Sequence, residues 1–442
     1  MKKLVSIHKQ YLILLFIIIG FQSTHAQVWT IQQCIDTAQV HNKNLQISKN
    51  NIQSGEQKQM EAMANLFPKI NANADYRYYT NLPYQLMPLS VFGGPDGKFK
   101  EAQFGVPHNI NANLQFSMPL YNSQIIGAIQ NSKLASEINL LQYKKTEEQI
   151  FFEISNLYYN VQILNSQLAF IDSNLLNSKL LLKNVLLLKE QLLAKGSDVN
   201  KIQLQVEQLT TQRALIKSKT DQVLNALEFT IGLSSEQKIE IDLKIKYQDK
   251  IQYTNSTTTD IQLVKTQNRF IKNELRTIRN SKLPSLSLFG TYGTMGYGYD
   301  KVPNDFLKFY PIGFGGVQLN FPLLNGTVTQ RKINQKKIDL KNSELQELLV
   351  IEQNNMFVEN AKLQRESVAN SVETNLSQIQ LAKSIYHQTV LQQKQGIATL
   401  TDVLLADNSL RESQQNYLSA VIEYLKSDLE LKKLSGNIST TK

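Results

Sequence analysis

The sequence of 442 residues predicts a mainly helical protein with a β-barrel portion, built from a helix–strand–strand–long helix–helix unit that occurs twice. Three observations predict this fold class: the positions of the prolines, the change in hydrophobic period along the chain, and the recurrence of short motifs. All ten prolines fall in the windows 68–119 and 284–322. Because proline breaks the interior of a helix, the proline-free stretches 120–283 and 323–442 are the segments that can form long helices.

The proline-free stretches carry the hydrophobic period of supercoiled helices. In the first stretch, apolar residues follow a 4-3-4-3-4-3-4 spacing at Ile150, Ile154, Leu157, Val161, Leu164, Leu168, Ile171 and Leu175. Such a seam favours paired helices. We expect long helices over 123–193, 199–230, 326–394 and 400–434. A continuous helix over 123–193 would be about 105 Å long, more than a compact domain needs.

Within the proline windows the period becomes two, which predicts strands. The expected strands cover about 69–80, 108–120, 284–294 and 310–322. Each has one apolar face and one amide-rich face, and the residues expected to face a lumen are Asn109, Asn111, Asn113, Gln115, Gln318 and Asn320. Membrane barrel strands alternate in this way, but so does a half-buried soluble sheet. The N-terminal export signal described next and the tyrosines near the strand ends favour the membrane barrel.

The first 26 residues have the pattern of a secretory signal peptide. Three lysines precede the apolar run 11–21, and Thr24-His25-Ala26 supplies small residues at the two positions that a signal peptidase reads. The run is too short to span about 30 Å of hydrocarbon, although an uncleaved anchor is the alternative. Removing residues 1–26 takes away three lysines and no acid, so the formal charge falls from +10 to +7.

The composition excludes several classes of protein. The single cysteine, Cys34, allows neither an intrachain disulfide nor a cysteine zinc site. A mean hydropathy of −0.28 excludes a multi-span helical permease. No basic run is interleaved with aromatic residues, so we expect no nucleic-acid partner. Neighbouring carboxylates such as Glu147 and Glu148 do not face each other on a helix. We therefore expect no enzyme activity, no catalytic residue, no cofactor and no metal site.

The two halves of the chain repeat the same order of elements. Residues 118–122 are matched 203 residues later by 321–325, and Asp198 is matched 204 residues later by Asp402. A longer loop in the first half, 81–107 against 295–309, accounts for a larger offset between the preceding strands. The expected divisions are a first repeat at 27–232, a linker at 233–257, a second repeat at 258–436 and a tail at 437–442.

Four strands per chain cannot close a barrel. An open edge in lipid leaves unpaired backbone groups that cost several kcal/mol each. The barrel must therefore close with copies of the chain: two copies give eight strands with a filled interior, and three give twelve strands with room for a lumen. The long helices cannot lie in lipid because their outer faces are polar.

Several segments resemble the TolC-type outer-membrane efflux protein family. They are Trp29-Thr30-Ile31, 282–288 at a helix-to-strand junction, 396–404 at a helix tip, and the shorter tip 195–199. The resemblance implies a homotrimer with one twelve-stranded outer-membrane barrel, continued by a twelve-helix tunnel in the periplasm. It also implies an outer-membrane channel for efflux or type I secretion, in contact with lipid and working with a periplasmic adaptor (membrane fusion) protein and an inner-membrane pump of the RND or ABC type.

The resemblance also suggests roles for the helix tips. Asp402 matches a tip position that lines the periplasmic constriction, and Asp198 is its mate in the first repeat, so both are candidate gate and selectivity residues. A ring of carboxylates in three chains would attract cations and repel anions. The alternative is that such an aspartate caps its helix. A second tip acid of the family would fall at Leu405, and Ala398 stands where some relatives hold a latch arginine.

Gly196 and Gly396 are candidate adaptor contacts, because small residues at a tip would let an adaptor helix approach. The alternative for each is a turn that requires positive φ. For the whole chain, the alternative function is an exported coiled-coil structural or adhesin protein without a pore.

Overall fold

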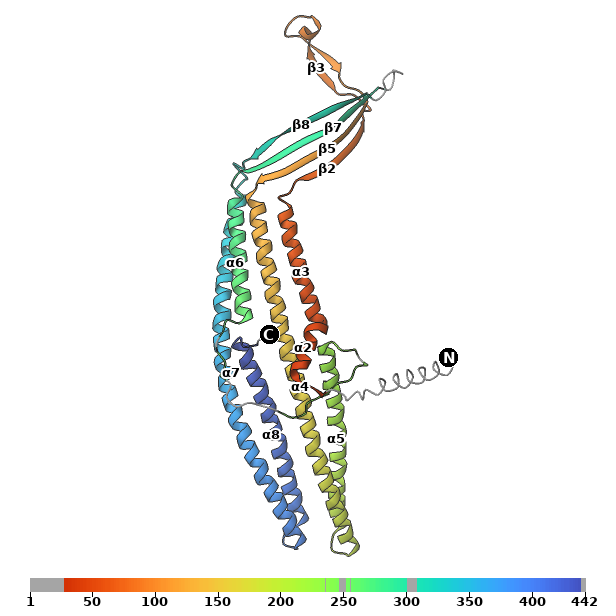
Figure 1. Ribbon diagram of the computed structural model, residues 1–442, viewed down its shortest axis with the longest axis vertical. Coiled ribbons are helices and arrows are strands. Elements are labelled where there is room, and N and C mark those ends of the chain that lie inside the picture. Colours follow the sequence, from red (N-terminus) through yellow and green to blue (C-terminus); the bar gives the residue numbers. More distant parts are fainter. Residues whose placement is uncertain (1–27, 235, 246–251, 255, 300–307, 439–442) are drawn as a thin grey trace, which may run out of the picture. The chain divides into compact units, whose positions relative to one another are not determined.

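The computed structural model describes residues 28–234, 236–245, 252–254, 256–299 and 308–438 (Figure 1). The expected signal peptide 1–26 lies outside the described residues, as do parts of the expected linker 233–257 and tail 437–442. The chain forms two compact units. With the gaps just given, the sheet unit comprises 51–140 and 263–348, and the helical unit comprises 28–50, 141–262 and 349–438.

Long helices dominate the chain, which confirms the prediction of a mainly helical protein. Helix α4 (Ser123–Glu190) and helix α7 (Val328–Lys394) contribute residues to both units. The remaining long helices are α5 (Gly196–Ile231) and α8 (Leu400–Leu434) in the helical unit.

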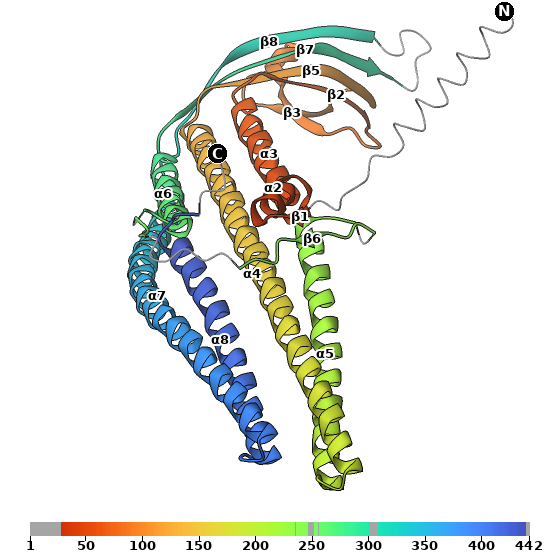
Figure 2. The same cartoon turned by 60° about the horizontal axis from the view of Figure 1, so that its bottom comes forward.

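The sheet unit holds one four-stranded antiparallel sheet. Its strands are β2 (Lys69–Tyr78), β5 (His108–Tyr121), β7 (Ser285–Gly298) and β8 (Lys308–Asn320). Their order is β2-β5-β7-β8, and Figures 1 and 2 show the four strands side by side. Strands β5 and β7, from different halves of the chain, form the central pair. Among the described residues β2 and β8 each have one partner, so the sheet of a single chain is open rather than closed.

The strand ends differ from the expected ones for local reasons. Strand β7 continues past 294 to Gly298. The sequence did not indicate this length because glycines such as Gly290 and Gly293 interrupt the alternation of apolar and polar side chains. Strand β8 begins two residues earlier than expected and ends before Pro322, which has no N–H for a ladder. The expected loop 81–107 contains a hairpin instead, formed by β3 (Tyr84–Pro88), the 3₁₀ turn η1 (Leu89–Phe92) and β4 (Phe99–Gln103).

The helices of the sheet unit follow the lateral order of the strands. Asn139 on α4 donates to the Asn51 carbonyl on α3 (Lys43–Ala64). Asn273 on α6 (Thr259–Asn280) donates to Asn131 on α4. Lys336 on α7 pairs with Glu274 on α6 at 2.9 Å. The helix order α3-α4-α6-α7 therefore matches the strand order, as expected when each helix runs directly into or out of one strand.

The helical unit is held by the predicted hydrophobic seam. The seam residues on α4 are buried, apart from Leu157 and Leu168, which are half-buried. One cluster packs α4 and α5 against α2 (Ile31–His41) and the short parallel pair β1 (Val28–Trp29) and β6 (Glu240–Ile241). A second joins Ile163 on α4 to α7 and α8. A third joins α4, α5 and the start of α8. The helices therefore pack in the order α5-α4-α8-α7.

Candidate functional site

The register of the sheet separates two chemically different faces. Residues directly opposite each other in antiparallel strands share a face, and alternate residues along a strand share it too. By this rule the pairs Asn73↔Asn113 and Ser287↔Gln318 lie on the same face. All six residues expected on the amide-rich side share it: Asn109, Asn111, Asn113, Gln115, Gln318 and Asn320. We call this the polar face.

The polar face carries a connected row of hydrogen bonds. Arg77 pairs with Asp75 at 2.9 Å, Asn111 donates to Asp75 at 3.2 Å, and Asn113 donates to Asn111 at 3.0 Å. The Lys, Arg, Asp and Glu residues of these four strands also lie on this face, namely Lys69, Asp75, Arg77 and Lys308. Charges and ordered amides require water or polar partners, so this is the face suited to an aqueous lumen.

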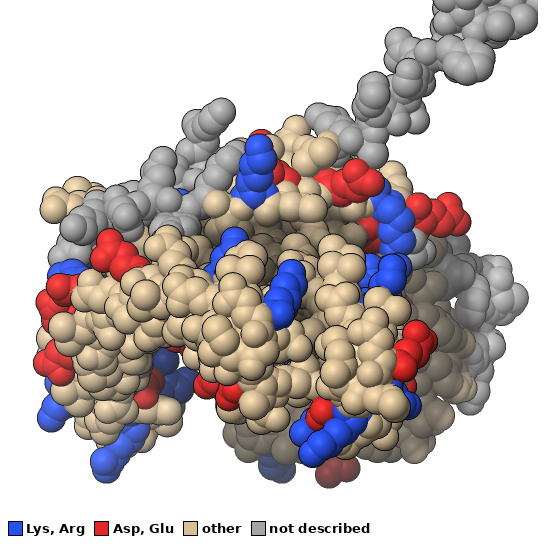
Figure 3. All heavy atoms as spheres, turned by 90° about the horizontal axis from the view of Figure 1, so that it is seen from below, with Lys and Arg blue, Asp and Glu red and all other residues tan. Residues whose placement is uncertain are grey.

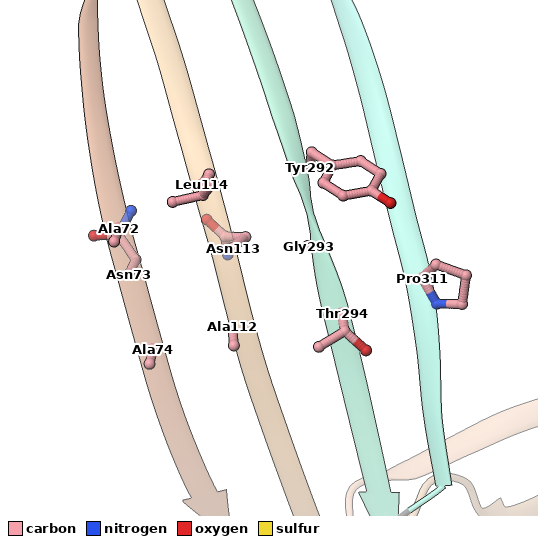
Figure 4. A pocket seen from close by; sticks show the side chains of 10 residues that line it. All are labelled: Ala72, Asn73, Ala74, Ala112, Asn113, Leu114, Tyr292, Gly293, Thr294 and Pro311. Carbon is pink, nitrogen blue, oxygen red and sulfur yellow. The ribbon is translucent and has the colours of Figure 1, made fainter.

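The opposite face is apolar. It carries Ile70, Ala72, Ala74, Tyr76, Ile110, Ala112, Leu114, Phe116, Leu288, Tyr292, Val317 and Leu319. Ile70, Tyr292 and Leu319 are each about two-thirds exposed in the single chain (68%, 71% and 67%). Figure 4 shows residues that line an open depression in the sheet, where the small side chains of Ala72, Ala74 and Ala112 lie on the same face as the larger Leu114 and Tyr292.

Aromatic residues gather at one end of the apolar face. The Tyr76 hydroxyl and His108 Nδ1 are 2.7 Å apart, and the Tyr78 ring lies 5.0 Å from the His108 ring. Aromatic girdles with a polar atom at the ring edge are typical of the ends of membrane barrel strands. A single chain thus exposes an apolar band, with aromatic rings at one end, on the side of the sheet opposite to the polar face.

At the helix tips, Asp402 is part of a capping box at the start of α8. Its carboxylate accepts from the Thr399 N–H at 2.8 Å and from the Thr399 hydroxyl at 2.6 Å. The Asp402 N–H donates back to the Thr399 hydroxyl at 3.2 Å. These hydrogen bonds hold the pKa of Asp402 below its usual range, so the exposed carboxylate stays charged. The capping role is therefore present, and a gate role stays a prediction that capping does not oppose.

Asp198 lies in the first turn of α5 and faces Lys201 at 3.8 Å. Its neighbour Val199 packs in the same cluster as Leu400 and Leu404 of α8, which brings the two tips of the helical unit together. Basic and acidic side chains are interspersed on the face of the molecule shown in Figure 3. A ring of these acids would need further copies of the chain.

The two tip glycines differ. Gly396 has φ +76°, the left-handed conformation that favours glycine. Gly196 is the first residue of α5 and does not have positive φ. The alternative interpretation of Gly196 as a left-handed turn residue is therefore wrong. In the first tip Leu192 takes that conformation instead, with φ 62°, and it is 92% exposed. The turn residue was missed because leucine rarely adopts this conformation.

A buried polar cluster near the tips was not predicted as a site. Asp407 on α8 is 3% exposed, accepts from the Gln205 amide on α5, and pairs with Arg411 at 3.0 Å. Gln205 also donates to Ser178 on α4 at 3.1 Å. Burial raises the pKa of the Asp407 carboxyl, against the opposing effects of Arg411 and Gln205.

The spacing of Val403, Asp407 and Leu410 is 4-3, which places an acid in the hydrophobic seam of α8. That spacing is the signal by which the sequence could have revealed the cluster. In the family, a second tip acid would stand at the position of Leu405, which is 60% exposed here. Asp407 lies on a different face of the helix, as the sequence spacing indicates, and so does not replace that acid.

Other kinds of site find no support in the described residues. No group of three or more His, Cys, Asp or Glu side chains is arranged to hold a metal ion within that part of the chain. In the same part of the chain, each helix falls short of the apolar length that crossing a membrane requires.

The fold, a four-stranded antiparallel sheet with long helix pairs, has TolC-type outer-membrane channels as its structural neighbours. Among solved structures, the outer membrane protein VceC from Vibrio cholerae matches with a TM-score of 0.73 and 14% identity, over 92% of this chain and 96% of VceC. CusC matches with a TM-score of 0.76 and 15% identity, over 92% of both chains. The CmeC outer membrane channel from Campylobacter jejuni matches with a TM-score of 0.74 and 13% identity, over 92% of this chain and 85% of CmeC.

The resemblance to TolC-type channels expected from the sequence is thereby confirmed at the level of the fold, while the trimeric twelve-stranded barrel and the repeat stay predictions. The sequence itself matches no family model and no curated protein. At identities of 13–15% the structural likeness establishes the fold, and function has to be argued from the faces of the sheet and the helices.

Proposed function

We propose that this protein is the outer-membrane channel of a tripartite efflux or type I secretion system. The observation that carries the proposal is the two-faced open sheet. Its polar face holds the charges of the four strands and its other face is an exposed apolar band. Lipid against one face and water against the other satisfies both, and no enzyme chemistry is required.

The open edges of β2 and β8 support assembly with other copies. Four strands per chain make twelve in a homotrimer, which leaves room for an aqueous lumen. Long helices with exposed polar faces would continue this lumen into the periplasm. In this proposal the apolar band contacts outer-membrane lipid, and the helix tips at Gly196 and Gly396 meet a periplasmic adaptor that couples the channel to an inner-membrane pump.

Asp402 and Asp198 are the proposed gate residues. A charged Asp402 on an exposed first turn, with its pKa held low, supports a role in cation attraction at a narrow tip. The six amide residues of the polar face would line the wider barrel. Capping by Asp402 and pore lining are compatible, because the carboxylate bonded to Thr399 keeps its charge.

The experiment is to express the full chain in a Gram-negative host, fractionate the membranes, and reconstitute the purified protein in planar bilayers. We expect it in the outer-membrane fraction, as a trimer by native mass spectrometry, with discrete conductance steps. A monomer released with the soluble periplasmic proteins, with no conductance, would contradict the proposal and favour an exported coiled-coil structural or adhesin protein.

A further inference from the structure

The polar face is not uniform, because its β7 and β8 half is aromatic. The register places six apolar or aromatic side chains on the same face as the amides of β2 and β5. They are Phe289, Met295, Tyr297, Tyr310, Ile312 and Phe314, and we call them the aromatic panel. Asn113, for example, lies opposite Gly293, which in turn lies opposite Ile312 of the panel.

The aromatic rings of the panel are partly exposed and do not form a buried hydrophobic core. The Phe289 and Phe314 rings meet edge to face, with centroids 6.4 Å apart at 69°. The Tyr297 and Tyr310 rings are 6.0 Å apart at 50°. Phe314 is 55% exposed and Tyr310 is 52% exposed. Angled rings of this kind leave a face or an edge open to a further ring.

A glycine opposite Phe289 lets its ring lie against the sheet. A Cβ added at Gly316 would come within 3.1 Å of the Phe289 ring. Because Gly316 is the residue directly opposite Phe289 on β8, the ring occupies the space that a side chain would fill. The panel is thus a broad surface, formed where glycine leaves room for large rings.

Within the four strands, the charged residues on this face are three cations and one acid. Arg77, Asn109, Tyr297 and Lys308 form one row across the sheet, so two cationic residues share a row with a panel tyrosine. Lys69 shares the row of Ser117 and Phe289. Asp75 is the acid of this face within the four strands, and it is paired with Arg77 and Asn111. Such a surface is complementary to an anion with an apolar body.

We propose that the aromatic panel is a binding surface for amphipathic organic anions that carry an aromatic ring, and that such molecules are a cargo class of this channel. The proposal rests on the proposed function, since it needs the polar face to line a lumen. Lipid is not the occupant, because the panel shares its face with four charged residues. A bare divalent cation is not favoured either, because Asp75 is already paired.

The test is block of the reconstituted full-length channel in planar bilayers at pH 7. The probes are naphthalenesulfonate, methanesulfonate of the same charge without the ring, and naphthylmethyl-trimethylammonium with the ring and the opposite charge. We expect naphthalenesulfonate to reduce the current at concentrations at least about fivefold lower than either other probe. Each interacting ring contributes a modest preference of this order.

Variants locate the effect. The double variant Phe289→Leu/Phe314→Leu keeps apolar volume but removes two rings, and should weaken block by naphthalenesulfonate about fivefold or more. Lys308→Gln should weaken block by the sulfonate without strengthening block by methanesulfonate. Tyr292→Leu is the control, because it removes one ring from the apolar face of the same strand pair and should leave block unchanged.

A second measurement does not depend on which part of the pore limits the current. Photolabelling of the detergent-solubilised full-length protein with a benzophenone sulfonate, mapped by peptide mass, should label 289–297 and 308–314 and be competed by naphthalenesulfonate. Equal block by all three probes, or labelling that the double variant does not reduce, would overturn the panel proposal while leaving the channel intact. A wild-type protein without conductance would instead contradict the proposed function.

Discussion

The side-chain amide of Gln205 on α5 donates to the buried carboxylate of Asp407 on α8, and so connects the two helix pairs of the helical unit. Asn174 to Gln414 at 2.9 Å and Gln167 to Gln415 at 2.8 Å join the same pairs further along. Polar contacts of this kind fix how the pairs meet, because each buried group needs its partner in place.

Replacing Gln205 by alanine should loosen this connection. The Asp407 carboxylate would lose a donor while staying buried, at a cost of about 1–3 kcal/mol. Hydrogen exchange of the full-length protein should then show exchange in 199–210 and 400–411 faster by about tenfold. Gln203→Ala is the matched control. Gln203 is exposed, and in the described part of the chain its side chain donates to Glu207 of the same helix. Equal exchange in both variants would contradict a linking role.

Protonation of the Asp407 carboxyl should stabilise the helical unit in mild acid, relative to a variant with a neutral side chain at this position. Burial raises its pKa, so the folded state binds a proton more readily than the unfolded state does. As the pH falls from neutral towards 4, the wild type should therefore gain unfolding free energy relative to Asp407→Asn. Thermal melts of both proteins at several pH values measure this difference. A difference that does not vary with pH would show that the carboxyl does not titrate in this range.

Adjacent residues on β2 test which face meets lipid. Ala72→Arg places a charge on the apolar face, which costs about 2–4 kcal/mol near the middle of a bilayer. Asn71→Arg places the same charge one residue away on the polar face and should be tolerated. Quantitative blotting of the assembled protein in outer membranes should show a severalfold loss for Ala72→Arg alone. Comparable levels of the two variants would contradict a lipid-facing apolar band.

Substitutions at Asp402 and Thr399 distinguish a gating role of the Asp402 charge from its role in capping α8. Asp402→Ala removes a charge and half of the capping box, and should raise single-channel conductance or weaken block by multivalent cations. Thr399→Ala breaks the cap, at a cost of about 1 kcal/mol to the helix start, but keeps the carboxylate. It should therefore leave the block by cations in place. If both variants change the block alike, or neither does, Asp402 does not act through its charge.

Much of the fold follows from local sequence. The proline windows and the change from a heptad seam to a period of two separate helices from strands without reference to any partner. Residues such as Ile150 and Ile154 are buried as their spacing requires. Strand ends were harder to predict: glycine carries no side chain, so the alternation along β7 fades from Gly290 onwards although the ladder with β5 continues to Gly298.

The candidate sites depended more on distant neighbours. The amides of β5 were visible because polar and apolar residues alternate strictly along one strand. The aromatic panel was not, because the face of Phe289 is defined only by the residues opposite it on β5 and β8, and a slip of one residue would reverse it. The Gln205–Asp407 contact likewise joins positions 202 residues apart.

The sequence by itself determined where the long helices and the four strands of the main sheet lie, though not the hairpin of β3 and β4, because hydrophobic period and proline act within a few residues. Only the tertiary structure decided that β5 pairs with β7, that one face carries both amides and rings, and that an aspartate lies buried between helix pairs. Those relationships come from backbone hydrogen bonds and packing between segments distant in the chain, which no local pattern specifies.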